Sequence, residues 1–204
     1  MRGYISPAAL VLFLLWMSVH SLSAFTTVVV DAGHGGGDRG GIPGQRYAEK
    51  TYTLDVAQRL ASLLTTQGLK VVMTRNSDTF IELSRRCYIA NKTPKCIFVS
   101  IHFDAYYSAT GHGVTTYYTR SNSRNLAQYV HVRMIQKLKP RQDRGIKRSR
   151  FFVTRNTAPP AILVEGGFLT HYQWEAKRIL QPEYRQAMAE AIAQGINDYK
   201  QRDD

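Results

Sequence analysis

The stretch VVVDAGHGGGD at residues 28–38 decides the fold of this chain. A continuous β-branched run is typical of a strand buried on both faces, and a glycine-rich turn that carries His34 follows it. Two later stretches share this pattern of an apolar strand that ends in a polar side chain: VSIHFD at 99–104, with His102, and ILVEGGF at 162–168, with Glu165. Because a sheet brings the ends of distant strands together, we expect these three side chains to converge.

Strand and helix patterns alternate along the rest of the chain. Gly68, Pro94 and Pro140 stand where helical patterns are expected to end. We predict helices over 51–67, 83–91, 123–138 and 182–199. We predict strands over 26–31, 69–75, 96–101, 113–119, 151–154 and 161–165. This alternation predicts a single α/β domain, a twisted, mostly parallel sheet with helices on both faces.

The first 24 residues have the layout of a secretory signal peptide. Arg2 precedes an apolar run over 8–19, and the small residues Ser21, Ser23 and Ala24 follow it. An uncleaved N-terminal anchor is the alternative, although the run is short for a spanning helix. Both interpretations predict that residues 25–204 are exported, to the periplasm or to the cell wall and extracellular space.

The chain is strongly basic. Its 204 residues include 27 Lys and Arg against 15 Asp and Glu, which gives a formal net charge of +12. A basic balance favours anionic partners such as nucleic acid, an anionic membrane or an acidic cell-wall polymer. Many of the cations cluster over 137–155, where a solvated basic face is the simplest interpretation. No nucleic-acid fold signature accompanies them, and we predict no nucleic-acid partner.

The sequence has two cysteines, Cys87 and Cys96. An exported chain can pair them in a disulfide. Two free, buried thiols are the favoured outcome, and their spacing does not suggest a zinc knuckle.

The polar side chains at the strand ends, together with Glu49 after the loop over 40–48, can form a catalytic zinc site. Two imidazoles and one carboxylate leave a fourth position for water, and a second carboxylate outside the metal shell can move its proton. The residues allow Glu49 as ligand and Glu165 as acid/base, or the reverse. Each residue also has a structural explanation: Glu49 suits the first turn of a helix, and glycines serve tight turns. We expect His131 at an outward helix position.

A series of short motifs follows in a fixed order along the chain. They are Asp31-Ala32-Gly33-His34-Gly35-Gly36 with Asp38 and Gly40, Glu49-Lys50, Thr74-Arg75, Asp78, Arg86, Ala90-Asn91, Ser100-Ile101-His102, Gly113, Pro160, Val164-Glu165 and Gly167-Phe168. Each is a weak signal alone, but the ordered set is specific. On these motifs, which span roughly residues 28–199, the chain resembles the zinc-dependent N-acetylmuramoyl-L-alanine amidases of the bacterial cell wall.

The resemblance implies a role for each site residue. His34, Glu49 and His102 match the zinc ligands, with one Zn²⁺ per chain, and Glu165 matches the catalytic glutamate. The implied reaction is hydrolysis of the amide between N-acetylmuramic acid and L-alanine in peptidoglycan, which releases stem peptides. Residues 25–204 are then the catalytic domain. Asp104, Arg86 and His171 are the expected substrate contacts.

Three positions depart from the family pattern. Asp104 stands where asparagine is frequent, Arg39 where proline is common, and His171 where asparagine is common. Regulated relatives carry a long inserted helix near residues 120–144, and its absence predicts an uncovered site controlled from elsewhere. Besides peptidoglycan, an anionic wall polymer and an activator or regulator are the partners left open, and we expect a monomer. The alternative functions are a zinc carboxypeptidase on wall peptides and a non-catalytic peptidoglycan-binding domain of the same fold.

Overall fold

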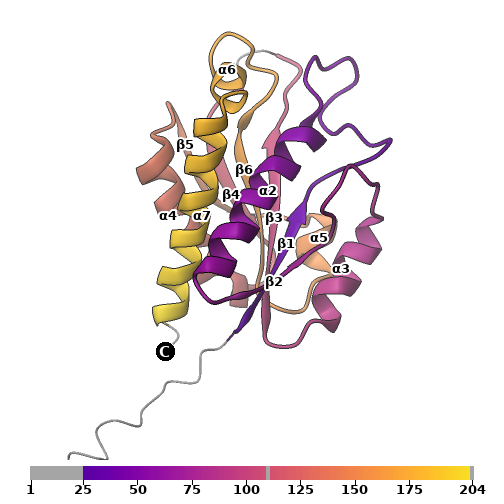
Figure 1. Cartoon of the computed structure of the whole chain (residues 1–204). Coiled ribbons are helices and arrows are strands. Elements are labelled where there is room, and N and C mark those ends of the chain that lie inside the picture. The colour runs from indigo at the N-terminus through magenta and orange to yellow at the C-terminus, as the bar shows by residue number, and fades with distance from the viewer. Residues whose placement is uncertain (1–24, 109–110, 203–204) are drawn as a thin grey trace, which may run out of the picture.

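The computed structural model describes residues 25–108 and 111–202, and the predicted export segment over 1–24 lies outside them. The strands are β1 (Thr27–Ala32), β2 (Lys70–Met73), β3 (Cys96–Asp104), β4 (Val114–Tyr118), β5 (Asp143–Arg148) and β6 (Ala161–Phe168). They form one six-stranded sheet in the order β2-β1-β3-β6-β4-β5 (Figure 1). β4 pairs antiparallel with β6, and the other pairings are parallel.

The central strands are apolar because helices cover both of their faces. Val28 and Val30 of β1 belong to the larger core cluster, whereas Val29 belongs to a smaller cluster on the opposite face. This two-sided burial explains the continuous β-branched run, since an alternating pattern would have left one face in water.

The helices form two layers around the sheet. They are α2 (Glu49–Thr66), α3 (Leu83–Lys92), the 3₁₀ turn η1 (Ser121–Ser123), α4 (Arg124–Leu138), α5 (Phe152–Arg155), α6 (Glu175–Ile179) and α7 (Pro182–Arg202). α7 packs between α2 and α4 over the larger core, and α3 and α5 pack together on the other face (Figure 1). Within the described ranges, no helix combines the length and apolarity needed to cross a membrane.

The predicted mostly parallel sheet between helical layers is confirmed, and one predicted strand is wrong. Residues 151–154 were expected to be extended, but Phe152–Arg155 is the helix α5. Val153 and Thr154 are buried there, so packing against α3 and β6 overrides the β-propensity of the aromatic and β-branched residues. The strand β5 lies just before it, at Asp143–Arg148, and was not predicted because its sequence DRGIKR lacks a strand pattern. The short helix α6 was also not predicted.

Three further side chains bear on the predictions, and one of them differs from its expected position. His131 is only 4% exposed, so the expected outward position is wrong. Its Nδ1 lies 3.1 Å from Thr116 Oγ1 and its Nε2 2.8 Å from Asp143 Oδ1, which ties α4 to β4 and β5. Cys87 and Cys96 are free and buried, as favoured.

Candidate metal centre and active site

His34 is presented by the tight turn that follows β1. Its own backbone is left-handed, with φ 62°, and the turn closes through two backbone hydrogen bonds between Gly35 and Asp38, 3.0 and 3.1 Å long. Lys50, in the first turn of α2, donates to the carbonyl of Gly36 at 2.7 Å. The glycine-rich loop is therefore anchored to the start of α2, which is the helix that carries Glu49.

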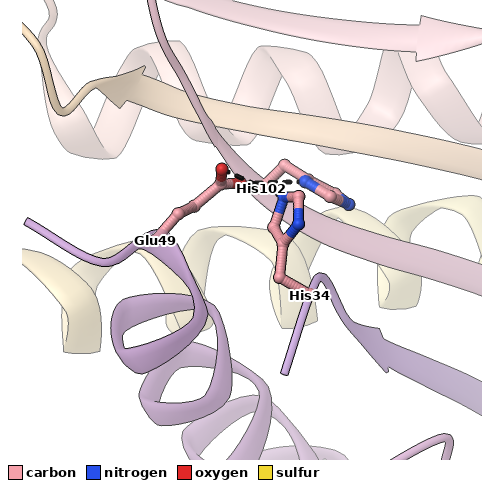
Figure 2. Close-up of side chains that lie close together, drawn as sticks. All are labelled: His34, Glu49 and His102. Carbon is pink, nitrogen blue, oxygen red and sulfur yellow. Dashed lines mark hydrogen bonds and ion pairs between the residues drawn. The ribbon is translucent and has the colours of Figure 1, made fainter. Parts of the chain in front are cut away.

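Glu49, His34 and His102 point toward one another from three separate elements: the start of α2, the loop after β1, and β3 (Figure 2). Glu49 is 3% exposed. Its Oε2 lies 3.0 Å from His34 Nε2, and its Oε1 lies 2.9 Å from His102 Nδ1. Burial alone would raise the pKa of Glu49, but hydrogen bonds from His102 and His34 outweigh it and lower the pKa to about 2. Glu49 is thus held as an anion, which a metal ligand requires.

The three side chains fit a divalent transition metal. Their ligand atoms all lie within 4.8 Å of one another. Metal–ligand bonds of about 2.0–2.2 Å in a tetrahedron separate ligand atoms by roughly 3.4 Å, which is close to the 2.9 and 3.0 Å observed between the carboxylate and the rings. Two imidazoles and one carboxylate are a usual catalytic zinc set with a fourth position free.

Two glycines make room for this donor set. A Cβ at Gly33 would lie 2.3 Å from His102 Cε1, and one at Gly40 would lie 2.6 Å from Glu49 Oε2 and 2.5 Å from His34 Cδ2. Gly40 also has φ +72°, a conformation that other residues rarely adopt. These glycines let the backbone approach the candidate metal ligands, whereas the glycines were predicted only to serve tight turns.

Asp38 orients the first histidine. His34 Nδ1 lies 2.8 Å from Asp38 Oδ2, and Asp38 Oδ1 accepts a 3.0 Å hydrogen bond from the backbone N–H of Gly40. A carboxylate on the distal ring nitrogen fixes the tautomer, and Nε2 is then the nitrogen that faces the donor set. The sequence marked Asp38 as part of a motif without assigning it this role.

Glu165 lies on β6 in register with His102 of β3. It is 9% exposed, and its Oε2 makes no hydrogen bond within the described residues. Burial, followed by the negative charges of Glu49 and Asp104, raises the pKa of Glu165 well above its ordinary value. Of the two carboxylates, Glu49 is therefore the one that contacts both histidines. Glu165 lies on the next strand, and its Oε2 has no hydrogen-bond partner among the described residues.

Arg86, an expected substrate contact, is occupied by the protein itself. Its side chain is 2% exposed, and it binds Asp31 Oδ1 at 2.8 Å, the carbonyl of Ala32 at 2.6 Å and the carbonyl of His34 at 2.7 Å. We therefore interpret Arg86 as a positioning residue for the loop that carries His34. Burial of a charge with this many partners is the usual arrangement for a structural arginine.

A second buried arginine extends this support. Arg75 donates from Nε to the carbonyl of Ala32 at 2.9 Å, and from Nη2 to the carbonyl of Gly33 at 2.7 Å. The same Nη2 lies 3.1 Å from Thr53 Oγ1 in α2. Thr74-Arg75 was predicted only as a motif, because most partners of Arg75 are backbone carbonyls, which no side-chain pattern reveals.

The other two expected substrate contacts are Asp104, at the end of β3, and His171, in the segment after β6. Asp104 ends β3, and its Oδ1 accepts a 2.9 Å hydrogen bond from the N–H of Ala105. Burial raises the pKa of Asp104. The ring of His171 lies 6.1 Å from that of His112, centroid to centroid, and its Nδ1 is buried without a hydrogen-bond partner among the described residues. Their contacts with substrate remain predictions.

A mostly apolar cleft of about 420 Å³ adjoins the two histidines. The side chains that line it come from β1 and the loop after it, from β3 and β6, from the segment that leads into α3 and the start of that helix, and from α5 with the residue before it. They include His34, His102, Phe80, Leu83, Phe151 and Phe152. A concave apolar surface beside convergent polar groups is the usual form of a small-molecule or substrate site.

A mostly parallel sheet that gathers two imidazoles and a carboxylate at the carboxyl ends of its strands, next to a buried unpartnered acid, defines a candidate metal-dependent hydrolase. The chain belongs to the N-acetylmuramoyl-L-alanine amidase family, whose model matches residues 28–198.

Relatives and solved structures agree with this assignment. The chain is 34% identical over 177 residues to the N-acetylmuramoyl-L-alanine amidase LytC of Bacillus subtilis (strain 168), which covers 85% of this chain and 35% of LytC. The catalytic domain of the amidase CwlV from Bacillus (Paenibacillus) polymyxa var. colistinus is similar with a TM-score of 0.81 and 36% identity, covering 86% of this chain and 98% of that chain. The amidase AmiC2 of Nostoc punctiforme has a TM-score of 0.81 and 37% identity, covering 88% and 98%.

Proposed function

We propose that this chain hydrolyses the amide bond between N-acetylmuramic acid and L-alanine in peptidoglycan and releases stem peptides, with zinc as its cofactor. The observation that carries the proposal is the arrangement of carboxylates in a chain of this family. Glu49 faces both histidines, while the buried Oε2 of Glu165, on the strand next to that of His102, has no hydrogen-bond partner among the described residues.

Each residue has a step in the proposed reaction. His34, Glu49 and His102 would hold the ion. When bound, such an ion polarises a carbonyl and lowers the pKa of adjacent water to about 7. Glu165 takes a proton from the water that attacks the lactyl carbonyl and gives it to the amide nitrogen as the C–N bond breaks. The products are a free carboxylate on the muramoyl group and a free amine on L-alanine.

The raised pKa of Glu165 suits this double role. A group that accepts and then donates a proton works best when its pKa lies near the operating pH, and burial moves a carboxyl pKa in that direction. A non-catalytic peptidoglycan-binding domain would have no use for an unpaired buried carboxylate, whose desolvation is costly. A zinc carboxypeptidase remains the alternative within enzymes, since the same chemistry cuts other amides.

The proposal includes export and a set of partners. Residues 25–204 would act outside the cytoplasmic membrane, where peptidoglycan lies. The chain's formal charge of +12 suits contact with an anionic wall polymer. We propose that the domain acts as a monomer and that its site is uncovered. Activity of the purified domain without any added activator tests whether the site is uncovered.

Digestion of purified sacculi tests the reaction. Mass spectrometry should find free stem peptides with an L-alanine amino terminus. Loss of a terminal D-alanine would instead indicate a carboxypeptidase, and bound zinc without any product would indicate a binding domain.

Elemental analysis tests the metal ligands separately from the reaction. His34→Ala and His102→Ala should each lower the zinc content, whereas His112→Ala, a half-buried histidine outside the donor set, should retain it. Equal zinc content in all three variants contradicts the assignment.

A further inference from the structure

We propose that Arg144 and Lys147 of β5 form a subsite for a carboxylate on the peptide side of the substrate, close to the scissile amide. The subsite rests on the proposed amidase function and deepens it, because it specifies which chemical group of the stem peptide the protein recognises.

Strand register aligns Arg144 with the active site. His102 on β3 pairs with Glu165 on β6, and Glu165 pairs in turn with Thr115 on β4. Thr115 faces the bulge of β5 that contains Arg144. Paired residues on adjacent strands share a face of the sheet, so this row runs across the face that carries Glu165 and His102.

Lys147 extends the same face by one step. It pairs with Tyr117, which lies two residues from Thr115 and therefore on the same side of β4. The ring of Tyr117 packs against Phe151 with centroids 4.9 Å apart, and Phe151 lines the apolar cleft. Lys147 is exposed at the edge of the sheet, where a substrate that lies along the cleft can reach it.

Arg144 is held near the site with a donor still free. Its guanidinium carbon lies 5.2 Å from the ring centroid of Phe168, whose partner on β3 is Asp104. Its Nη1 donates to the carbonyl of His112 at 3.3 Å. Its Nε is buried and makes no hydrogen bond within the described residues. A buried unpartnered guanidinium N–H costs free energy that an anionic ligand would recover.

Both cations of the proposed subsite are available to pair with an anion. Within the part of the chain that the structure describes, neither Arg144 nor Lys147 joins an ion pair. Asp104 and Glu165 are acids on this face, and Glu175 accepts hydrogen bonds from the N–H groups of Gly113 and Phe168 beside Arg144. Within the described residues, none of these three acids forms an ion pair with Arg144 or Lys147. The apolar cleft has Arg86 as its cation, which is already bound to Asp31.

The spacing between β3 and β5 suits a peptide carboxylate close to the scissile amide. β3 and β5 are three strand intervals apart, about 14 Å, and the two cationic side chains span part of that gap. Two extended peptide residues reach up to about 7 Å. A carboxylate one or two residues beyond the scissile amide is therefore the group that Arg144 and Lys147 can meet.

Two synthetic substrates that differ in one group test the subsite: N-acetylmuramoyl-L-alanyl-D-glutamate and its amide, N-acetylmuramoyl-L-alanyl-D-isoglutamine. The native chain should favour the compound with the free α-carboxylate by about 10-fold in kcat/KM, the size expected of a charge-assisted hydrogen bond, since the γ-carboxylate is present in both. Arg144→Gln/Lys147→Gln should cleave both at similar rates. Lys70→Gln, an exposed lysine on the opposite edge strand, should keep the preference.

Binding separates this inference from the proposed reaction. Dissociation constants of both compounds are measured in the Glu165→Ala background, with and without the two β5 substitutions. A preference for the carboxylate that depends on Arg144 and Lys147 supports the subsite even where no cleavage occurs, and the absence of cleavage then counts against the amidase proposal alone. Equal affinity for the two compounds, or a preference that survives Arg144→Gln/Lys147→Gln, overturns the subsite.

Discussion

Two buried acids on one face of the sheet have opposite surroundings. Asp31 at the end of β1 is 1% exposed and accepts hydrogen bonds from Thr74, Arg86 and Ser100, 2.6 to 2.8 Å long. Glu165 on β6 is 9% exposed, and its Oε2 has no partner among the described residues.

This difference distinguishes an acid that stabilises the fold from an acid that can take part in a reaction. A buried carboxylate whose lone pairs are satisfied stabilises the native state and cannot readily exchange a proton. A buried carboxylate without partners costs stability, so its presence next to a donor set indicates a functional role. One face of the sheet thus contains two acids with different roles. Asp31 binds Arg86, which holds the loop that carries His34, and Glu165 is available to react.

Removal of the unpartnered acid should have the largest effect. Glu165→Ala should lower amidase activity about 100- to 10,000-fold, because the general acid/base contribution disappears. Zinc content and the unfolding midpoint should stay near those of the native chain. Activity on sacculi is the measurement, and a Glu165→Ala variant with full activity would mean that some other group moves the proton.

Removal of the satisfied acid should act on stability. Asp31→Ala leaves the buried guanidinium of Arg86 without its counter-charge and should lower the free energy of unfolding by about 3–5 kcal/mol. Denaturant titration measures this. Glu190→Ala is the control: it breaks the exposed pair with Lys137 and should cost less than about 1 kcal/mol. Similar losses in the two variants would contradict the contrast drawn here.

Removal of the metal should lower the free energy of unfolding through the loss of its bonds to His34, Glu49 and His102. It should leave the hydrogen bonds of Asp31 intact. With free zinc at 100 times its dissociation constant, binding adds about 2.7 kcal/mol to the free energy of unfolding, and a chelator should abolish that increment. Glu49→Gln, which removes the carboxylate facing both histidines, should shrink the increment strongly. An unfolding curve that is the same with and without chelator would argue against a metal at this site.

The smallest effect should come from the residue behind His34. Asp38→Ala removes the acceptor from His34 Nδ1 and should weaken zinc affinity about 10- to 100-fold. Asp143→Ala is a matched control, because Asp143 binds His131 at the same 2.8 Å distance away from the donor set. Competition with a chelating dye measures both variants, and equal affinities would show that Asp38 does not tune the site.

Local patterns made much of the site predictable. His34 and His102 stand at the ends of apolar strands, and Glu49 begins α2. Strand ends and helix starts depend on short-range periodicity and turn chemistry, which a sequence displays directly. Arg86 was predicted to contact substrate, and its contacts within the protein were not foreseen. Three of its partners, Asp31 and the carbonyls of Ala32 and His34, lie far from it in the sequence, and only the carbonyl of Ile81 is near.

The basic segment shows where such prediction fails. DRGIKR has neither alternation nor an apolar run, yet it forms β5 because β4 offers a free edge and Ile146 packs against the main core. Phe152–Arg155 has strand-forming residues, yet it is helical because its buried side chains pack against α3. Both outcomes depend on contacts between distant segments, which outweigh local propensity.

The sequence by itself determined the α/β alternation, the two histidines at the strand ends and the presence of two candidate carboxylates, because each depends on residue type and local spacing. The tertiary structure alone decided which carboxylate the histidines engage and which remains unpartnered. It also decided that Arg144 and Lys147 of the edge strand β5 lie on the same face of the sheet as Glu165 and His102. The physical reason is that partner choice in a folded chain is set by strand register and burial, and both arise only when distant segments pack together.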